Sequence, residues 1–229
     1  MKFKGISKLT LLDYPEHLAC TLFVGGCQFR CPFCHNSELV LRPNEETSFN
    51  EKEILYFLKS RVGRLEGVCI TGGEPTMYPD LKEFIKKVKR LGFLVKLDTN
   101  GTNPKLVKEL LDEELLDMIA MDIKSSLEHY DKAAGTTVKL DDIGRTVDFI
   151  RSSGIDYEFR TTLVRGLQTK EDMASIGKWL SGAKAYYLQN FVNNGNLIDN
   201  SMTGFTPDEM KEMLDIVKAY IPEAKLRGI

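Results

Sequence analysis

The sequence lacks the features that mark nucleic-acid-binding, membrane and secreted proteins. Its 31 lysine and arginine residues nearly balance 33 aspartate and glutamate residues, so the formal net charge is −2, and no long basic run stands out. This balance argues against a surface that binds nucleic acid or anionic lipid. No apolar run approaches the roughly 18 residues that a membrane helix needs, and the N-terminal stretch is too polar for a signal peptide. We therefore expect a cytoplasmic protein with no nucleic-acid or membrane partner.

Cysteine is also scarce, which argues against a disulfide framework. The chain has five cysteines, and an odd number in a cytoplasmic protein is not typical of structural disulfides. Cys20 and Cys69 lie inside apolar stretches, where an unpaired cysteine packs as a small hydrophobic residue, so we expect both in the core. Cys27, Cys31 and Cys34 fall within eight residues and need a separate explanation.

The length and the hydrophobic pattern favour one α/β domain. The 229 residues are 42% hydrophobic and 28% charged, which predicts a single domain over residues 1–229 with an ordinary core. Short apolar segments alternate with amphipathic ones. The predicted strands are 18–24, 67–71, a segment ending near Asp98, 118–124, 156–164 and 185–191. The predicted helices are 49–62 with Ser48 as N-cap, 80–91, 104–112, 139–153, 170–180 and 206–220.

Single helices between strands imply right-handed crossovers and a parallel sheet. Six strand–helix units are two short of a complete eight-unit barrel. We therefore predict an α/β fold, a partial (β/α)6 TIM-like barrel with parallel strands, and keep a flat doubly wound sheet as the alternative. The tail 224–229 is expected to add a short edge strand, and 193–204 to form a loop.

Glycine and polar residues gather where the predicted strands end. GGCQFRCPFCHN follows the first strand, TGGEP the second and DTNG the third, while MDIK closes the fourth. In parallel α/β folds the carboxyl ends of the strands form the ligand-binding face. We therefore expect these segments to converge on one site.

The cysteine spacing Cys27-x3-Cys31-x2-Cys34 can aim three sulfurs at one point. Thiolates suit iron–sulfur clusters or zinc, and three of them leave one iron of a [4Fe–4S] cluster open for a substrate. Two alternatives stay open: a zinc site completed by His35, and a redox dithiol of Cys31 and Cys34, which leaves Cys27 unexplained.

The run CxxxCxΦC, with Phe33 as the aromatic residue, resembles the signature of the radical S-adenosylmethionine (SAM) superfamily. That resemblance implies a [4Fe–4S] cluster on the three cysteines, with SAM at the open iron and Phe33 near its adenine. The TGGEP segment resembles the GGEP motif of the same superfamily. By this resemblance Gly72, Gly73 and Glu74 bind the amino group of SAM.

Two further segments, Asp98–Gly101 and Met121–Lys124, resemble the DTNG and DxK segments of glycyl-radical-enzyme activases. The resemblance implies a monovalent cation held by Asp98, Thr99 and Asp122. It also implies a set of SAM-binding residues: Asn100, Lys124, Arg160 and Gln189. The alternatives are that Asp98 and Asn100 cap a turn and that Arg160 forms a surface salt bridge.

The first forty residues resemble the start of activating proteins of anaerobic ribonucleoside-triphosphate reductase. This resemblance implies an enzyme that cleaves SAM reductively and generates a glycyl radical on that reductase. It would need an electron donor such as flavodoxin or ferredoxin. The alternatives are an activase of another glycyl radical enzyme such as pyruvate formate-lyase, a small-molecule radical SAM enzyme such as a deazapurine carboxylate synthase, and a zinc-binding interaction module.

Overall fold

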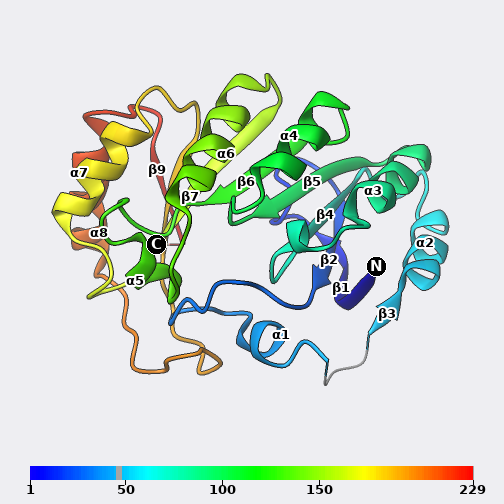
Figure 1. The fold of residues 1–229 in the computed structure, drawn as a ribbon, viewed down its shortest axis with the longest axis horizontal. Coiled ribbons are helices and arrows are strands. Elements are labelled where there is room, and N and C mark those ends of the chain that lie inside the picture. The colour runs from blue at the N-terminus through cyan, green and yellow to red at the C-terminus, as the bar shows by residue number, and fades with distance from the viewer. Residues whose placement is uncertain (45–47, 229) are drawn as a thin grey trace. The chain divides into compact units, whose positions relative to one another are not determined.

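The computed structural model describes residues 1–44 and 48–228. Its contacts divide the chain into two compact units. Figure 1 labels the helices and strands of the chain. The first unit contains residues 1–27, 38–120 and 141–156, and the second contains 28–37, 121–140 and 157–229. The expectation of one domain over the whole chain stays a prediction.

The first unit contains a sheet in the order β3-β1-β2-β4-β5-β6. Strand β2 (Ala19–Val24) pairs in parallel with β4 (Gly67–Gly72), which pairs in parallel with β5 (Leu94–Thr99). Strand β1 (Lys2–Thr10) is antiparallel to both β2 and β3 (Phe49–Asn50). The register sets Val24 opposite Gly72, so two of the predicted motifs start side by side.

The helices of the first unit supply its apolar packing. They are α2 (Glu51–Lys59), α3 (Leu81–Arg90), α4 (Pro104–Asp112) and α6 (Leu140–Ser152), with α1 (Ser37–Leu41) and the 3-10 turn η1 (Pro75–Met77) in the connections. Helix α3 buries four residues spaced three and four apart. Helix α2 begins at Glu51, because Asn50 and Glu53 form a reciprocal capping box. The expectation that Ser48 is the N-cap was therefore wrong.

The second unit contains strands in the order β6-β7-β8-β9. Strand β6 (Met118–Asp122) starts in the first unit and ends here. Strands β7 (Asp156–Leu163), β8 (Tyr186–Asn190) and β9 (Lys225–Arg227) run parallel. Helices α5 (Tyr130–Ala134), α7 (Lys170–Trp179) and α8 (Pro207–Lys218) complete the unit. Strand β9 confirms the predicted tail strand, and residue 229 lies outside the described residues.

The α/β class and the mostly parallel sheet are confirmed. Cys20 and Cys69 are fully buried in β2 and β4, as expected of strands covered on both faces. Among the described residues, no helix is long and apolar enough to cross a membrane.

Candidate functional site

The loop that carries Cys27 begins where β2 ends, and the TGGEP segment lies against it. The amide of Gly73 donates to the carbonyl of Val24 at 2.9 Å, and the amide of Glu74 donates to the carbonyl of Gly26 at 2.8 Å. A Cβ atom on Gly73 would lie 1.8 Å from the Gly26 oxygen. Only glycine allows this approach of two backbones, so Gly73 is required for the path of the chain into Cys27.

Glu74 joins the TGGEP segment to the DTNG segment. Its carboxylate accepts hydrogen bonds from the amide and hydroxyl of Thr76 at 3.0 and 2.5 Å. It also accepts from the Thr99 hydroxyl at 2.8 Å and the Asn100 amide at 2.7 Å. The side chain is 1% exposed. We call Glu74, Thr76, Thr99, Asn100 and Cys27 the Glu74 group.

Burial raises the pKa of the Glu74 carboxyl, and the four hydrogen bonds oppose that rise. All four donors belong to the protein itself. The carboxylate therefore fixes the two strand-end loops to each other. Its expected contact with the amino group of SAM stays a prediction.

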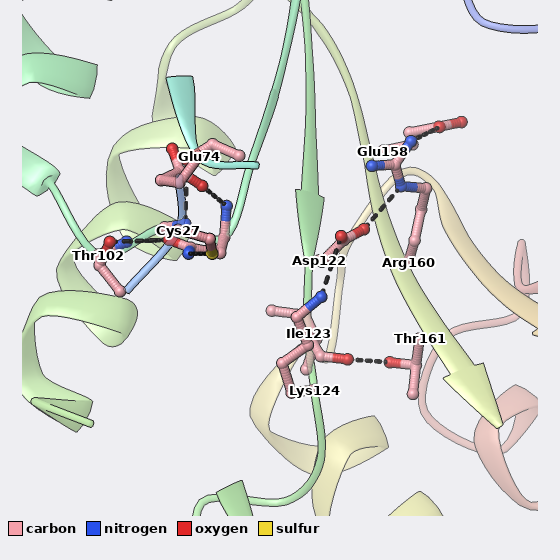
Figure 2. A network of polar contacts seen from close by, with 12 residues as sticks. Cys27, Glu74, Thr102, Asp122, Ile123, Lys124, Glu158, Arg160 and Thr161 are labelled. Atoms are coloured by element: carbon pink, nitrogen blue, oxygen red, sulfur yellow. Dashed lines mark hydrogen bonds and ion pairs between the residues drawn. The ribbon is translucent and has the colours of Figure 1, made fainter. Parts of the chain in front are cut away.

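Asn100 makes a contact that the sequence analysis did not foresee. Its Nδ2 donates to the Cys27 sulfur at 3.7 Å (Figure 2). Its Oδ1 accepts from the amide and the hydroxyl of Thr102 at 3.1 and 2.7 Å, which is the turn-capping role considered as the alternative. Asn100 therefore both caps its turn and contacts a predicted cluster ligand.

Asp98 lies beside an ammonium group of the same strand. Lys96, which is 1% exposed, places its Nζ 2.5 Å from Asp98 Oδ1. Thr99 donates to Glu74 and accepts from the Gly101 amide at 3.1 Å. The Lys96 contact was missed, although a lysine inside an apolar strand needs a partner and is a usable signal. Asp98 and Thr99 belong to the first unit and Asp122 to the second, so the cation site they were expected to share stays a prediction.

Cys31, Phe33 and Cys34 belong to the second unit, where backbone contacts seat their segment. The Arg30 amide donates to the Ala134 carbonyl at 2.8 Å, and the Cys34 amide donates to the Cys31 carbonyl at 3.0 Å. Gly135 has φ +66°, and a Cβ atom there would lie 2.1 Å from the Arg30 oxygen. The end of α5 therefore needs glycine in order to hold the cysteine segment.

Phe33 and His35 lie on opposite sides of Cys34 in the sequence, and both pack on Phe191. Phe33 meets the Phe191 ring edge-on at 6.5 Å between ring centres, and the Lys124 ammonium lies 6.0 Å from the Phe33 ring. His35 stacks on Phe191 at 5.4 Å, and its Nε2 lies 2.8 Å from the Val192 carbonyl. These contacts hold the cysteine segment against the end of β8.

Burial raises the pKa of the Cys34 thiol, although the nearby Lys124 charge opposes this. A protonated thiol is a poor metal ligand, because metals bind the thiolate. Metal binding would have to displace that proton.

A charged group surrounds Asp122 where β6 ends. Arg160 Nε donates to Asp122 Oδ1 at 2.9 Å, and Lys124 Nζ donates to Oδ2 at 3.1 Å (Figure 2). Burial favours the protonated acid, but the two cations outweigh it and hold the pKa of Asp122 well below its usual range. The Lys124 carbonyl accepts from Gln168 Nε2 at 2.6 Å. We call Asp122, Lys124 and Arg160 the Asp122 group.

Arg160 and Gln189, both expected to bind SAM, lie on neighbouring strands of the second unit. Arg160 is paired with Asp122 and its side chain is only 13% exposed, so its ion pair is not on the open surface. Gln189 lies on β8, opposite Thr162 of β7 and Arg227 of β9. Whether either residue binds SAM stays a prediction.

The sequence model described as the Radical SAM superfamily matches residues 21–180. The chain belongs to the radical SAM superfamily. It is 30% identical over 237 residues to a protein of Methanocaldococcus jannaschii, covering 98% of this chain and 95% of the relative. A second protein of that organism is 28% identical, over 90% of this chain and 76% of the relative. The names of both assign them provisionally as glycyl-radical enzyme activating enzymes.

The solved structures support the same fold. A radical SAM methyltransferase from Sphaerobacter thermophilus matches with a TM-score of 0.69 at 16% identity, covering 93% of this chain and 67% of that one. The fold is thus that of the radical SAM enzymes, and the predicted partial barrel is confirmed as their fold class.

Membership in the radical SAM superfamily implies a [4Fe–4S] cluster and SAM, and the surroundings of Cys27 fit a ligand of such a cluster. No disulfide links the five cysteines, all of which lie in the described residues. The Cys27 sulfur accepts an amide N–H, as the sulfurs of iron–sulfur sites do. Within residues 1–44 and 48–228, no three His, Cys, Asp or Glu side chains are grouped as ligands of a single metal ion. The three cysteine ligands stay a prediction.

Proposed function

We propose that this radical SAM enzyme activates a glycyl radical enzyme, and that its partner is an anaerobic ribonucleoside-triphosphate reductase. One observation carries the first part: the 30% identity to a chain of that name extends over 98% of this one. The choice of reductase rests on the resemblance of the first forty residues, from SKLTLLDYPEHLAC through the cysteine segment. The electron donor in this proposal is a flavodoxin or a ferredoxin.

In this proposal Cys27, Cys31 and Cys34 hold the cluster. A bound cluster with SAM supplies one-electron cleavage of a carbon–sulfur bond, and the carbon radical released can take hydrogen from the Cα of a partner's glycine. The protein supplies binding and electrostatics. Asn100 supports the assignment of Cys27, since an amide donor stabilises negative charge on sulfur.

The proposed SAM-binding residues are those that the resemblance to the family implies. They are Phe33, Gly72, Gly73, Glu74, Asn100, Lys124, Arg160 and Gln189. Arg160 and Lys124 each carry one positive charge and Asp122 carries one negative charge, so the Asp122 group has a net charge of +1. The Lys124 and Arg160 side chains are only 15% and 13% exposed. Their excess positive charge favours binding of a carboxylate, which supports the assignment of Lys124 and Arg160 to the carboxylate of SAM. The monovalent cation at Asp98, Thr99 and Asp122 is a further part of the proposal.

The test is formation of a glycyl radical in the partner. Protein loaded with iron and sulfide without oxygen is mixed with SAM, a reductant and anaerobic ribonucleotide reductase, and the doublet signal of a glycyl radical is followed by electron paramagnetic resonance. We expect the doublet with wild-type protein. Cys31→Ala should abolish both the cluster absorbance and the doublet.

Cys69→Ala is the matched control, because this cysteine is fully buried in β4. It should keep the cluster and the doublet, with only a modest loss of stability from one deleted buried atom. A doublet with pyruvate formate-lyase alone would reassign the partner. Consumption of a small metabolite with no glycyl radical on any protein would replace the proposal by the small-molecule alternative.

A further inference from the structure

Arg160, assigned to SAM under the proposed function, is held from a second side by Glu158. The two residues are two positions apart on β7, so their side chains leave the same face of the strand. Arg160 Nη1 lies 3.6 Å from Glu158 Oε1, while Nε of the same guanidinium donates to Asp122 at 2.9 Å. The guanidinium therefore lies between two carboxylates (Figure 2).

Glu158 is in turn held by the last strand of the sheet. Arg227 donates to both of its carboxylate oxygens, from Nη1 at 3.1 Å and from Nη2 at 2.8 Å. The Arg227 guanidinium lies 3.9 Å from the centre of the Tyr187 ring on the intervening strand β8. A bidentate pair of hydrogen bonds together with stacking on an aromatic ring fixes both the position and the plane of an arginine guanidinium.

The energetics of Glu158 depend on this bond. Its side chain is 3% exposed, and an ionised carboxylate with so little water needs close partners. Its contact to Arg160 is long, whereas Arg227 reaches both oxygens. If Arg227 were removed, the carboxylate would draw Arg160 toward itself. That movement would shift the guanidinium that also bonds Asp122.

We propose that Glu158 and Arg227 are positioning residues for Arg160, and that through it they set the affinity of the protein for SAM. The inference rests on the proposed role of Arg160 in binding SAM. The alternating charges of Lys124, Asp122, Arg160, Glu158 and Arg227 form the physical connection from the strand-end site to the edge strand β9. If the Glu158–Arg227 ion pair only held β9 in the sheet, its loss would lower the stability of the protein but would leave its affinity for SAM unchanged.

The experiment measures the dissociation constant of SAM by anaerobic isothermal titration calorimetry on cluster-loaded protein. Arg227→Gln should weaken SAM binding about tenfold, the usual scale for residues that orient a binding group, with iron content unchanged. The SAM affinity of Arg227→Lys should fall between those of wild type and Arg227→Gln, because lysine keeps the positive charge but cannot form the bidentate hydrogen bonds of a guanidinium. Lys225→Gln, on the same strand but exposed, is the control and should bind SAM like wild type.

A double-mutant cycle separates positioning from general damage. In an Arg160→Gln background, Arg227→Gln should cause no further loss of affinity, since the residue it positions is gone. Glu158→Gln supplies a second route to the same result if Arg227→Gln does not fold.

Three outcomes would overturn the inference. Unchanged affinity in Arg227→Gln, Arg227→Lys and Glu158→Gln, with normal SAM binding by wild type, rejects the positioning role alone. An equal loss in the presence and absence of Arg160 does the same. Failure of the cluster-loaded wild type to bind SAM at all rejects the proposed function together with the inference.

Discussion

Two carboxylates at strand ends, Glu74 in the first unit and Asp122 in the second, are stabilised in opposite ways. Glu74 is 1% exposed and is bonded by neutral donors: two hydroxyls and two backbone amides. The Asp122 side chain is 35% exposed and accepts hydrogen bonds from an ammonium and a guanidinium group. Burial raises the pKa of a carboxyl group. Neutral donors reverse only part of that rise, whereas charged partners lower the pKa by more than burial raises it.

The two pKa values accordingly move in opposite directions. The pKa of Glu74 is raised, mainly by burial, and that of Asp122 is lowered, because its two cations outweigh burial. The difference suggests a division of labour. The Glu74 group is suited to fixing the shape of two loops, and the Asp122 group to presenting charge.

The largest effect we expect comes from Glu74→Ala. It leaves two buried amides and two hydroxyls without their acceptor and opens a cavity. Each buried group that loses its partner costs about 1–3 kcal/mol, and partial relaxation brings the total to about 3–5 kcal/mol in the free energy of unfolding. Urea denaturation of the metal-free protein measures it.

Glu128→Ala is the matched control, because Glu128 is exposed and lies outside the regular elements. Its effect should stay within about 0.5 kcal/mol. If the two variants were equally stable, the description of Glu74 as the fastening between two loops would be wrong.

A smaller effect is expected from Asp122→Asn. Removing one partner of a buried ion pair costs about 3–5 kcal/mol, but the exposure of Asp122 screens its charge, so we expect about 1–2 kcal/mol. Added salt should reduce this difference from wild type. It should leave the effect of Glu74→Ala unchanged, because the bonds of Glu74 are shielded from ions. Urea denaturation at low and high sodium chloride tests the contrast, and equal salt sensitivity would contradict it.

Much of the fold could be predicted, because local patterns decide it. The apolar spacing in α3 and the capping box of Thr206 and Glu209 in α8 mark those helices in the sequence, and the structure has both. Strand β1 was missed since only Phe3 is buried among its nine residues, so its sequence does not alternate between apolar and polar. The cap of α2 was misassigned because Ser48 and Asn50 are both good caps, and each has a glutamate three residues later, Glu51 and Glu53. In the structure the capping box forms at Asn50.

The site was predictable only to the level of its strands. Parallel register explains why TGGEP lies beside the end of β2, which is why the topological argument worked there. The pairing of individual side chains depends on distances that no local pattern contains. Arg227 and Glu158 are 69 positions apart in the sequence. They meet because β9 joins the sheet in a register that brings the two side chains within hydrogen-bonding distance. The Asn100 contact to Cys27 likewise depends on how two loops fold over each other.

The smallest effect concerns how stability depends on pH, and here the two carboxylates should differ in sign. A raised pKa means that folded Glu74 binds its proton more tightly than the unfolded chain does. The contribution of Glu74 to the free energy of unfolding is therefore fully present below the ordinary glutamate pKa of about 4.3 and is lost as the pH rises through the raised value.

A lowered pKa gives Asp122 the reverse behaviour. Its contribution to the free energy of unfolding is present above about 3.9 and is lost as the pH falls toward the folded value. As the pH rises above about 4.3, wild type should thus lose more stability than Glu74→Gln, while below about pH 4 the gap between wild type and Asp122→Asn should close as the pH falls. Urea titrations across this range measure both trends, and slopes of the same sign for the two variants would show that the neutral and the charged surroundings are electrostatically alike.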